Sequence, residues 1–404
     1  MVSVSHKTRV LAALALPVSA ALVLAGCASD SGDNGGSEGD SIIVGTTDKV
    51  TFLDPAGSYD NGSFAVMNQV FPFLLNSKPG TSDVEPDIAE SAEYTADGEY
   101  TVVLKSGLKF ANGNDLTSSD VKFSFDRQLA IADDNGPWSL LGAIDSIETP
   151  DDVTVVFHLK NGNDQTFPQV LSSPAGPIVD EEVFSADAIT PDDEIVAGEA
   201  FAGPYTITSY KFNELIQFAP NEAYQGLLGA PENAGVTLKY YTDASNLKLD
   251  VQEGNIDVAH RSLSATDIAD LRSQDSVKVV DGPGGEIRYI VFNFNTQPYG
   301  ATTPEADPAK ALAVRQAIAA TVDRQEIATQ VYKDTYTPLF SYVPQGLTGA
   351  TEVLKDLYGD GDVDKAKEIL EAAGVATPVA INLQYNPDHY GESSADEYAL
   401  IKEQ

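Results

Sequence analysis

The sequence predicts a mixed α/β protein with more than one lobe. Segments in which every second residue is apolar, the pattern of a half-buried strand, alternate along the chain with segments of helical periodicity. The chain has 404 residues, which at about 150 residues per domain gives two or three domains. Its 17 Tyr and 16 Phe, within a hydrophobic content of 42%, indicate a globular body with a sizeable core.

Residues 1–26 have the features of a secretory signal peptide. Lys7 and Arg9 give a positive start, and an almost wholly apolar run follows over residues 10–25. That run is too short for a comfortable membrane span and is interrupted by Pro17. Small residues at the end of the run fit a cleavage site, so we expect the signal to end at residue 26.

Cys27 is the only cysteine, and the stretch Leu24-Ala25-Gly26-Cys27 resembles the lipobox of bacterial lipoproteins. In that class the cysteine sulfur carries a diacylglyceryl group, and two acyl chains give a lasting membrane anchor. Residues 27–40, rich in Ser, Gly and Asp, are then a flexible tether. The alternative is an ordinary signal peptide that contains a cysteine by chance. A lipidated Cys27 leaves no thiol for a disulfide, a nucleophile or a zinc site.

The net charge is strongly negative, at −37 for the full chain. Such a charge opposes nucleic-acid binding, because phosphate contacts depend on Lys and Arg. It either favours cationic or neutral small partners or serves only solubility.

Strands and helices are expected from residue 41 onward. Alternating apolar residues predict strands at 41–47, 100–105, 153–159, 236–241, 277–280 and 288–294, two short strands between 201 and 218, and a hairpin over 108–116. Helical patterns predict helices at 63–75, 120–132, 244–254, 308–322 and 364–373. Ser118 or Ser119 can cap the second helix, Asp307-Pro308 opens the fourth, and Gly374 closes the fifth. The last ten residues are helical without a stop signal, so we expect the chain to break off inside a helix.

Several blocks resemble, in their order along the chain, the family 5 extracellular solute-binding proteins, which serve peptide, nickel and oligopeptide ABC importers. The most recognisable block is 86–127, which contains PDIAES, GEYT, GLKF and LTSSDV. Further blocks are FAGPYTITSYKFNELIQFAPNEAY at 201–224, LKLDVQEGNIDVAH at 247–260, FNFNTQPY at 292–299, VRQAIAATVDRQEI at 314–327 and DVDKAKEILEAAGV at 362–375.

The resemblance implies an α/β, two-lobed, periplasmic-binding-protein-like fold of type II, the Venus-flytrap fold. Residues 41–285 would form the first lobe, with an extra subdomain inserted over residues 76–165, and residues 286–404 the hinge and an incomplete second lobe. Members of this family usually continue well past this end point, so we expect a C-terminal truncation. Dipeptide-selective relatives tend to place an Arg just before Tyr385-Asn386-Pro387, where this chain has Leu383-Gln384, and this disfavours a dipeptide ligand.

The implied function is that of a substrate-binding lipoprotein of an ABC importer. It would capture peptides, oligopeptides above all, outside the cell membrane, close around them by hinge motion and deliver them to the permease. We expect a monomer anchored through Cys27 to the outer face of a bacterial cell membrane, on the periplasmic side in a Gram-negative cell, with no cofactor. An oligosaccharide or another small solute is the alternative ligand. The alternative classes are a secreted lipoprotein hydrolase and a surface adhesion module.

Catalytic and metal motifs do not support an enzyme. The sequence lacks a Gly-x-Ser-x-Gly elbow, a phosphate-binding loop and a His-Glu-x-x-His pair. The histidines that follow the signal are His158, His260 and His389. Acidic residues with the spacing of a calcium-binding EF-hand are Asp360, Asp362, Asp364 and Glu371. Lys365 stands where that loop requires Gly, so we interpret the stretch as a turn followed by a helix cap.

The candidate binding residues lie in loops and in the expected hinge. Tyr59, Asp60 and Asn61 follow the first strand, in a loop that runs along the ligand in the resembled family; a plain surface turn is the alternative. The other candidates are Trp138, Arg288, Tyr289, Asn293, Asn295, Tyr385 and Asn386.

Two further expectations concern the orientation of these residues. Asn293 and Asn295 should share the polar face of a hinge strand, with Phe294 on the opposite, core-facing side. Tyr385 and Asn386 should end a strand of the second lobe, and Trp138 should sit either at a core edge or on the ligand.

Overall fold

The structure is a computed structural model that describes residues 41–404 except 262, 283, 348 and 387–392. The expected signal peptide, Cys27 and the tether lie outside the described residues, as does His389. Strands and helices are mixed throughout the described part, so the predicted α/β organisation is confirmed. Within that part, no helix combines the length and the apolar character needed to cross a membrane.

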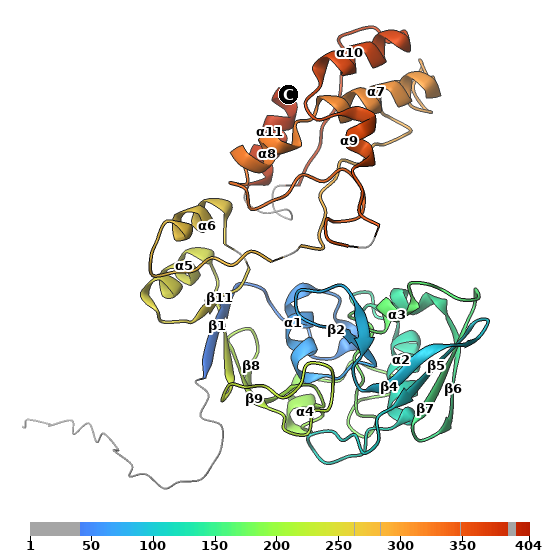
Figure 1. Ribbon diagram of the computed structural model, residues 1–404, viewed down its shortest axis with the longest axis vertical. Helices are drawn as coiled ribbons and strands as arrows, with labels where there is room; N and C mark the ends of the chain where they lie inside the picture. Colours follow the sequence, from blue (N-terminus) through green and yellow to red (C-terminus); the bar gives the residue numbers. More distant parts are fainter. Residues whose placement is uncertain (1–40, 262, 283, 348, 387–392) are drawn as a thin grey trace, which may run out of the picture. The chain divides into compact units, whose positions relative to one another are not determined.

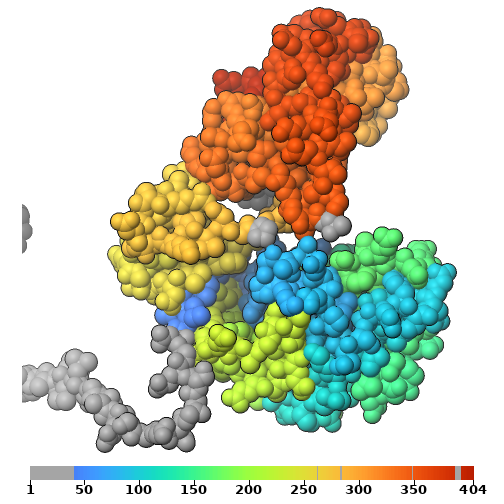
Figure 2. All heavy atoms as spheres, in the orientation of Figure 1, coloured from blue at the N-terminus to red at the C-terminus, as the bar shows by residue number. Residues whose placement is uncertain are grey.

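A five-stranded sheet has the order β11-β1-β10-β9-β8. Figure 1 labels β1, β8, β9 and β11 of this sheet. Its strands are β1 (Ile42–Thr46), β8 (Tyr205–Lys211), β9 (Leu215–Pro220), β10 (Val236–Tyr240) and β11 (Val258–Ala259). β1 pairs in parallel with β10 and β11, and β9 is antiparallel to both β10 and β8. Strands β1, β8, β10 and β11 therefore end at one edge of the sheet, which we call the carboxyl edge. In Figure 2 the blue atoms of the β1 region lie next to yellow atoms of the segment that carries β10 and β11.

A second, antiparallel sheet has the order β4-β5-β7-β6. Its strands are β4 (Ala89–Ala96), β5 (Glu99–Leu104), β6 (Ile144–Asp151) and β7 (Thr154–Leu159), and helix α2 (Ser118–Ile131) packs against it. The predicted alternation is confirmed, because Val102 and Phe157 point into a core shared with α2. The rings of Phe125 and Phe157 meet edge to face, 5.3 Å apart.

Shorter elements connect the two sheets and cover them. They are η1 (Pro55–Gly57), α1 (Asn61–Val70), β2 (Leu75–Ser77), β3 (Val84–Pro86), η2 (Trp138–Ala143), α3 (Phe167–Val170), α4 (Asp192–Ala197), α5 (Ala244–Glu253) and α6 (Ala265–Arg272). Helix α1 packs on β8, and its buried residues Val66, Met67 and Val70 join a second core with β8 and β9.

The carboxyl-terminal part of the described chain is helical. Its helices are α7 (Pro308–Thr321), α8 (Arg324–Gln330), α9 (Val353–Tyr358), α10 (Val363–Ala372) and α11 (Ser394–Glu403). Small residues allow α7 and α10 to pack closely, and Ala317, Ala320 and Ala366 form a buried cluster between them. The predicted N-cap is confirmed, since the Asp307 carboxylate accepts hydrogen bonds from the first turn of α7. The helical pattern of the last ten residues is confirmed by α11.

Several predicted elements are wrong. Residues 277–280 and 288–294 form no strand, because no neighbouring strand supplies hydrogen bonds to them, and Val280 and Val291 are exposed. For the same reason the expected strand before Tyr385 is missing. The first helix ends at Val70 because the following residues become extended. Thr117, and neither neighbouring serine, caps α2.

Candidate functional site

The carboxyl edge of the five-stranded sheet gathers polar and aromatic side chains from distant parts of the sequence. Asp48 follows β1, Tyr240 ends β10, and Arg261 follows β11. The Arg261 Nε atom lies 3.1 Å from a carboxylate oxygen of Asp48. Ligands of open α/β sheets bind at this kind of edge, because the loops that follow the strands converge there. The sheet topology therefore makes the carboxyl edge the candidate binding site.

Two titratable side chains of this edge are shifted by their surroundings. Burial raises the pKa of Tyr240, and the nearby carboxylates of Asp48 and Asp60 raise it further. The Tyr240 hydroxyl is buried and has no hydrogen-bond partner among the residues that the structure describes. Burial lowers the pKa of His260, against the attraction of Asp48. The Tyr240 hydroxyl is therefore a buried donor at this edge, and no described residue accepts a hydrogen bond from it.

The loop between β1 and α1 is fixed at both ends. At its start, the Asp54 carboxylate accepts a hydrogen bond of 2.9 Å from the amide of Ala56 and caps η1. At its end, the Asp60 carboxylate accepts a hydrogen bond of 2.8 Å from the amide of Ser63 and caps α1. Between them, Ser58 is buried while Tyr59 is 54% exposed. The loop therefore presents an exposed tyrosine on a backbone that its own hydrogen bonds hold in place.

Asn61 joins this loop to the ion pair at the carboxyl edge. Its side-chain amide donates a hydrogen bond of 3.2 Å to Glu286, and the same Glu286 oxygen lies 3.5 Å from the guanidinium of Arg261. The structure thus brings Asn61 together with residues that the sequence did not single out. Asp60, by contrast, is committed to helix capping, so the structure supports a positioning role for it.

Trp138 stands at the start of η2 and is 38% exposed. The preceding loop packs tightly on η1: a Cβ added to Gly136 would lie 2.0 Å from the carbonyl oxygen of Ala56. Only glycine therefore permits this approach, which brings the loop that leads to Trp138 against the loop that leads to Tyr59.

The predicted hinge residues have mixed surroundings. Arg288 pairs with Glu397 at 2.5 Å, and its guanidinium lies 5.5 Å from the ring centres of Tyr332 and Tyr336. Tyr289 is exposed and meets Tyr342 edge to face. Arg288 is thus engaged within the helical part of the chain, whereas Tyr289 presents most of its ring to solvent.

The predicted two-faced hinge strand is wrong. The Asn293 side chain accepts hydrogen bonds from the amides of Asn295 and Thr296 and so begins a turn. Phe294, expected in a core, is 64% exposed, with the guanidinium of Arg315 placed 4.6 Å from its ring centre. A turn breaks the alternation on which the prediction of opposite faces depended.

The last two candidates lie in a segment that is not a strand. The ring of Tyr385 stacks on Tyr398 of α11, with ring centres 5.1 Å apart, and remains half exposed. Asn386 is exposed.

Sequence reasoning missed Asp48, Tyr240, Arg261 and Glu286 as site residues. Asp48 directly follows a predicted strand and Tyr240 lies near the end of another, and this was their only signal. Arg261 and Glu286 had none, since no strand was predicted at β11. Strand order decides which strand ends converge, and that order was not predicted from the sequence.

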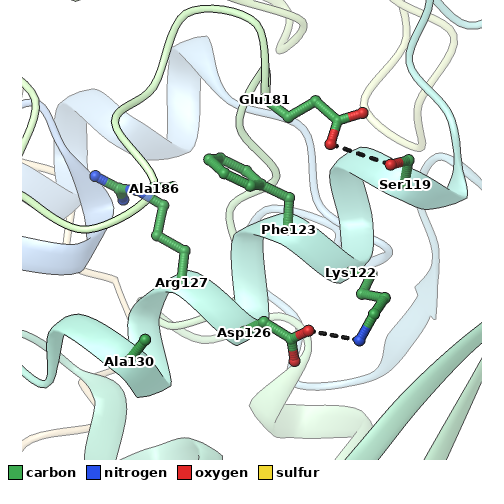
Figure 3. A pocket seen from close by; sticks show the side chains of 8 residues that line it. All are labelled: Ser119, Lys122, Phe123, Asp126, Arg127, Ala130, Glu181 and Ala186. Atoms are coloured by element: carbon green, nitrogen blue, oxygen red, sulfur yellow. Dashed lines mark hydrogen bonds and ion pairs between the residues drawn. The ribbon is translucent and has the colours of Figure 1, made fainter.

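Two surface hollows lie away from the carboxyl edge. One, of about 340 Å³, is lined mainly by residues of α2, among them the Lys122–Asp126 ion pair (Figure 3). The other, of about 370 Å³, is lined by acidic side chains near the start of α2. Two of these carboxylates have several partners: Asp120 accepts hydrogen bonds from the amides of Thr117 and Glu181, and Asp180 accepts them from Asn112 and Asn114. Neither hollow offers unused polar groups that converge on one point.

Among the residues described, no three His, Cys, Asp or Glu side chains meet in a way that could hold a metal ion. The interpretation of the EF-hand-like stretch as a turn and cap is confirmed. The Asp362 carboxylate accepts a hydrogen bond of 2.9 Å from the amide of Lys365 and caps α10. Asp360 accepts hydrogen bonds from Arg324.

Comparison with known proteins gives a family match over most of the chain. The family described as bacterial extracellular solute-binding proteins, family 5 (middle), matches residues 83–404. The dipeptide-binding protein of Escherichia coli is 26% identical over 82% of this chain, and the oligopeptide-binding protein AppA of Bacillus subtilis is 25% identical over 81%. The chain spans 63% and 62% of the lengths of these two relatives. Haem-binding protein A of Haemophilus influenzae is 27% identical over 88% of this chain and is covered to 67%.

Solved structures establish the fold. The ABC transporter substrate-binding protein CtaP of Listeria monocytogenes superposes with a TM-score of 0.73 at 24% identity, covering 90% of this chain and 70% of that one. AppA of Bacillus subtilis in complex with a nonapeptide gives a TM-score of 0.65 at 22% identity, covering 91% and 72%. The predicted type II periplasmic-binding-protein fold is thereby confirmed.

Proposed function

The chain belongs to the family 5 bacterial extracellular solute-binding proteins, and on this premise we propose that it is the substrate-binding component of an ABC importer for peptides, oligopeptides in particular. Members of this family are extracellular binding proteins. The observation that carries the proposal is the carboxyl edge, where the exposed Tyr59 and the Asn61 amide accompany the Asp48–Arg261 pair. Such groups recognise main-chain amides and charged termini without reading one sequence.

In this proposal residues 41–285 are the first lobe, with a subdomain inserted over residues 76–165, and residues 286–404 are the hinge and part of the second lobe. The protein works without turnover. It binds through Tyr59, Asn61 and Tyr289, with Trp138, Asn293, Asn295, Tyr385 and Asn386 as further contacts. Asp60 supports this set by capping α1, which fixes the backbone beside Asn61. Arg288 supports it through its ion pair with Glu397, next to Tyr289.

Lipid anchoring through Cys27 is a separate part of the proposal. It predicts that acyl label is incorporated in a bacterial host and that Cys27→Ser abolishes both the label and the membrane association. Labelling that persists in Cys27→Ser, or its absence from the natural chain, contradicts the anchor.

Native mass spectrometry of the protein without its expected signal peptide tests the ligand class. Co-purified masses that fragment to amino acids establish peptide binding and show the range of lengths. A haem mass with a Soret band, or the mass of another small solute, overturns the peptide assignment while leaving the binding-protein class intact. Hydrolysed peptide products in the same sample contradict that class as well.

A further inference from the structure

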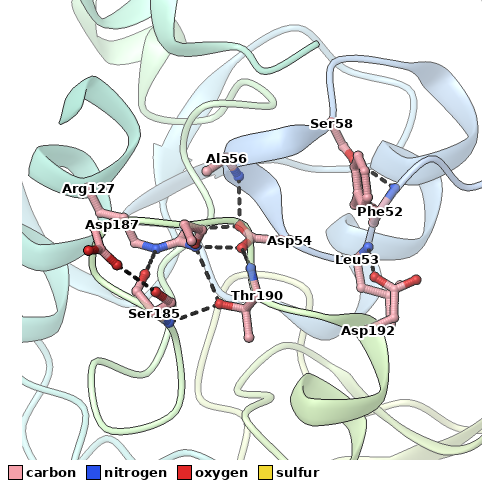
Figure 4. A network of polar contacts seen from close by, with 11 residues as sticks. Phe52, Leu53, Asp54, Ala56, Ser58, Arg127, Ser185, Asp187, Thr190 and Asp192 are labelled. Carbon is pink, nitrogen blue, oxygen red and sulfur yellow. Dashed lines mark hydrogen bonds and ion pairs between the residues drawn. The ribbon is translucent and has the colours of Figure 1, made fainter. Parts of the chain in front are cut away.

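A buried ion pair fastens the loop that carries Tyr59. Arg127 of α2 donates to both carboxylate oxygens of Asp54, at 2.8 and 2.5 Å (Figure 4). The side chains of Arg127 and Asp54 are 2% and 0% exposed. Asp54 is the first residue of the turn that leads from β1 into the loop Pro55–Asn61.

Both members of the pair make further hydrogen bonds. Arg127 donates to the carbonyl oxygens of Ser185 at 2.5 Å and of Ala188 at 2.8 Å. Asp54 accepts a further hydrogen bond of 2.7 Å from the amide of Thr190. One residue earlier, the amide of Leu53 donates to Asp192 of α4 at 2.8 Å. Three chain segments that are distant in sequence are therefore joined at the base of one loop.

Overall stability is a weak explanation for this arrangement. Removing a guanidinium and a carboxylate from water costs about as much free energy as their attraction returns, so a buried pair adds little to folding compared with apolar residues of the same volume. The pair does fix the orientation of the Asp54 side chain relative to Arg127, because a bidentate Arg–carboxylate contact allows only one relative orientation of the two groups.

We propose that Arg127 and Asp54 are positioning residues for ligand binding. They hold the loop Pro55–Asn61 in the one conformation that presents Tyr59 and Asn61 at the carboxyl edge, although neither touches ligand. This inference rests on the proposed function of that loop. A loop already ordered before binding loses less conformational entropy when ligand arrives, and this raises affinity.

The test compares Arg127→Lys, which keeps the charge but loses the planar fork, with Tyr224→Phe. The control removes the 2.5 Å hydrogen bond from Tyr224 to the buried Asp87, elsewhere in the first lobe, and leaves the loop alone. Asp54→Asn serves as a second, milder variant. The probe is the peptide that the natural protein retains most from a mixture of two to nine residues, and all variants are measured well below their unfolding temperatures.

We expect Arg127→Lys and Asp54→Asn to weaken binding of that peptide about tenfold and Tyr224→Phe to leave it within about twofold. Hydrogen–deuterium exchange should quicken over residues 53–63 in the first two variants only. Equal affinities in all variants together with unchanged exchange over residues 53–63 overturn the positioning role.

If the natural protein retains no peptide, the proposed function fails, and exchange alone decides the present inference. Faster exchange confined to residues 53–63 in Arg127→Lys and Asp54→Asn then still supports the positioning role of these two residues, whereas unchanged exchange overturns it.

Discussion

Two ion pairs flank the same loop and differ in their exposure to water. Arg127 and Asp54, behind the loop, are 2% and 0% exposed, whereas Arg261 and Asp48, at the carboxyl edge, are 43% and 25% exposed. Each polar side-chain atom of the buried pair has a hydrogen-bond partner in the protein, so the pair can fix geometry but cannot meet a ligand. The exposed pair contributes little to folding, because water and salt screen it, but its charges remain available. The comparison separates the groups that shape the site from the groups that would contact ligand.

The largest effect should come from breaking the buried pair with Arg127→Met. This leaves the Asp54 carboxylate buried and unpaired, and we expect unfolding in urea to show a loss of about 3–5 kcal/mol. Lys122→Met is the matched control on the same helix, since it breaks the exposed pair with Asp126 and should cost about 0.5 kcal/mol or less. Similar losses in both variants would contradict the contrast between the two environments.

A Cβ at Gly136 should be the next most damaging change. Gly136→Ala forces a methyl group against the Ala56 carbonyl, and we expect a loss of about 1–3 kcal/mol in the free energy of unfolding and weaker ligand binding. Gly142→Ala, in the neighbouring η2 turn, adds a methyl group that meets nothing within 4 Å. That control should leave the melting temperature nearly unchanged, and an equal drop in both variants would show that the contact does not matter.

Changes at Tyr59 and Asn61 should lower the affinity for ligand and leave the free energy of unfolding nearly unchanged. The double variant Tyr59→Ala, Asn61→Ala should weaken peptide affinity by about 1–2 kcal/mol, because an aromatic contact and an amide are lost. Its free energy of unfolding should change by about 0.5 kcal/mol or less. Leu249→Ala, which truncates an exposed residue of α5, controls for general surface change. Unchanged affinity in calorimetry would remove this loop from the site.

The exposed pair should show a small, salt-dependent effect. Arg261→Gln should change the free energy of unfolding by about 0.2–1 kcal/mol at low ionic strength and by less at high ionic strength. Denaturant titrations at the two salt concentrations measure it. If Arg261→Gln lowered the free energy of unfolding as much as Arg127→Met does, and equally at both salt concentrations, the Arg261–Asp48 pair would behave as a buried ion pair.

The smallest effect should be the pH dependence of His260. Its pKa in the folded protein lies below the ordinary value of 6.5, so the unfolded chain binds more protons as the pH falls through that value. Stability should therefore decrease slightly on acidification from about pH 7.5 to pH 5, and His260→Gln should lose less over this range. Thermal unfolding at both pH values checks the sign, which reverses if Asp48 dominates the surroundings of His260.

Features that depend on neighbours in the sequence were largely predictable. The Asp307 cap, the alternation in β5 and β7, and α11 follow from side-chain periodicity and backbone hydrogen-bonding within a few residues. Mistakes came where pairing with a distant segment decides the outcome. Residues 288–294 have a strand-like composition but no strand beside them, and Asn293 instead closes a turn on its own neighbours.

The sequence by itself determined the family and the fold class, because ordered blocks of residues encode these locally, and it singled out the loop with Tyr59 and Asn61 as a candidate. Only the tertiary structure decided which groups accompany that loop. The amide of Ile43 donates a hydrogen bond to the carboxylate of Asp257, which lies 214 residues further along the chain. The parallel pairing of β1 with β10 and β11 places Asp48, Tyr240 and Arg261 at one edge of the sheet. Tertiary structure likewise decided that Asp54 meets Arg127. Such contacts between distant segments form because strands and helices bury a shared apolar face, and a local pattern does not specify which partner they choose.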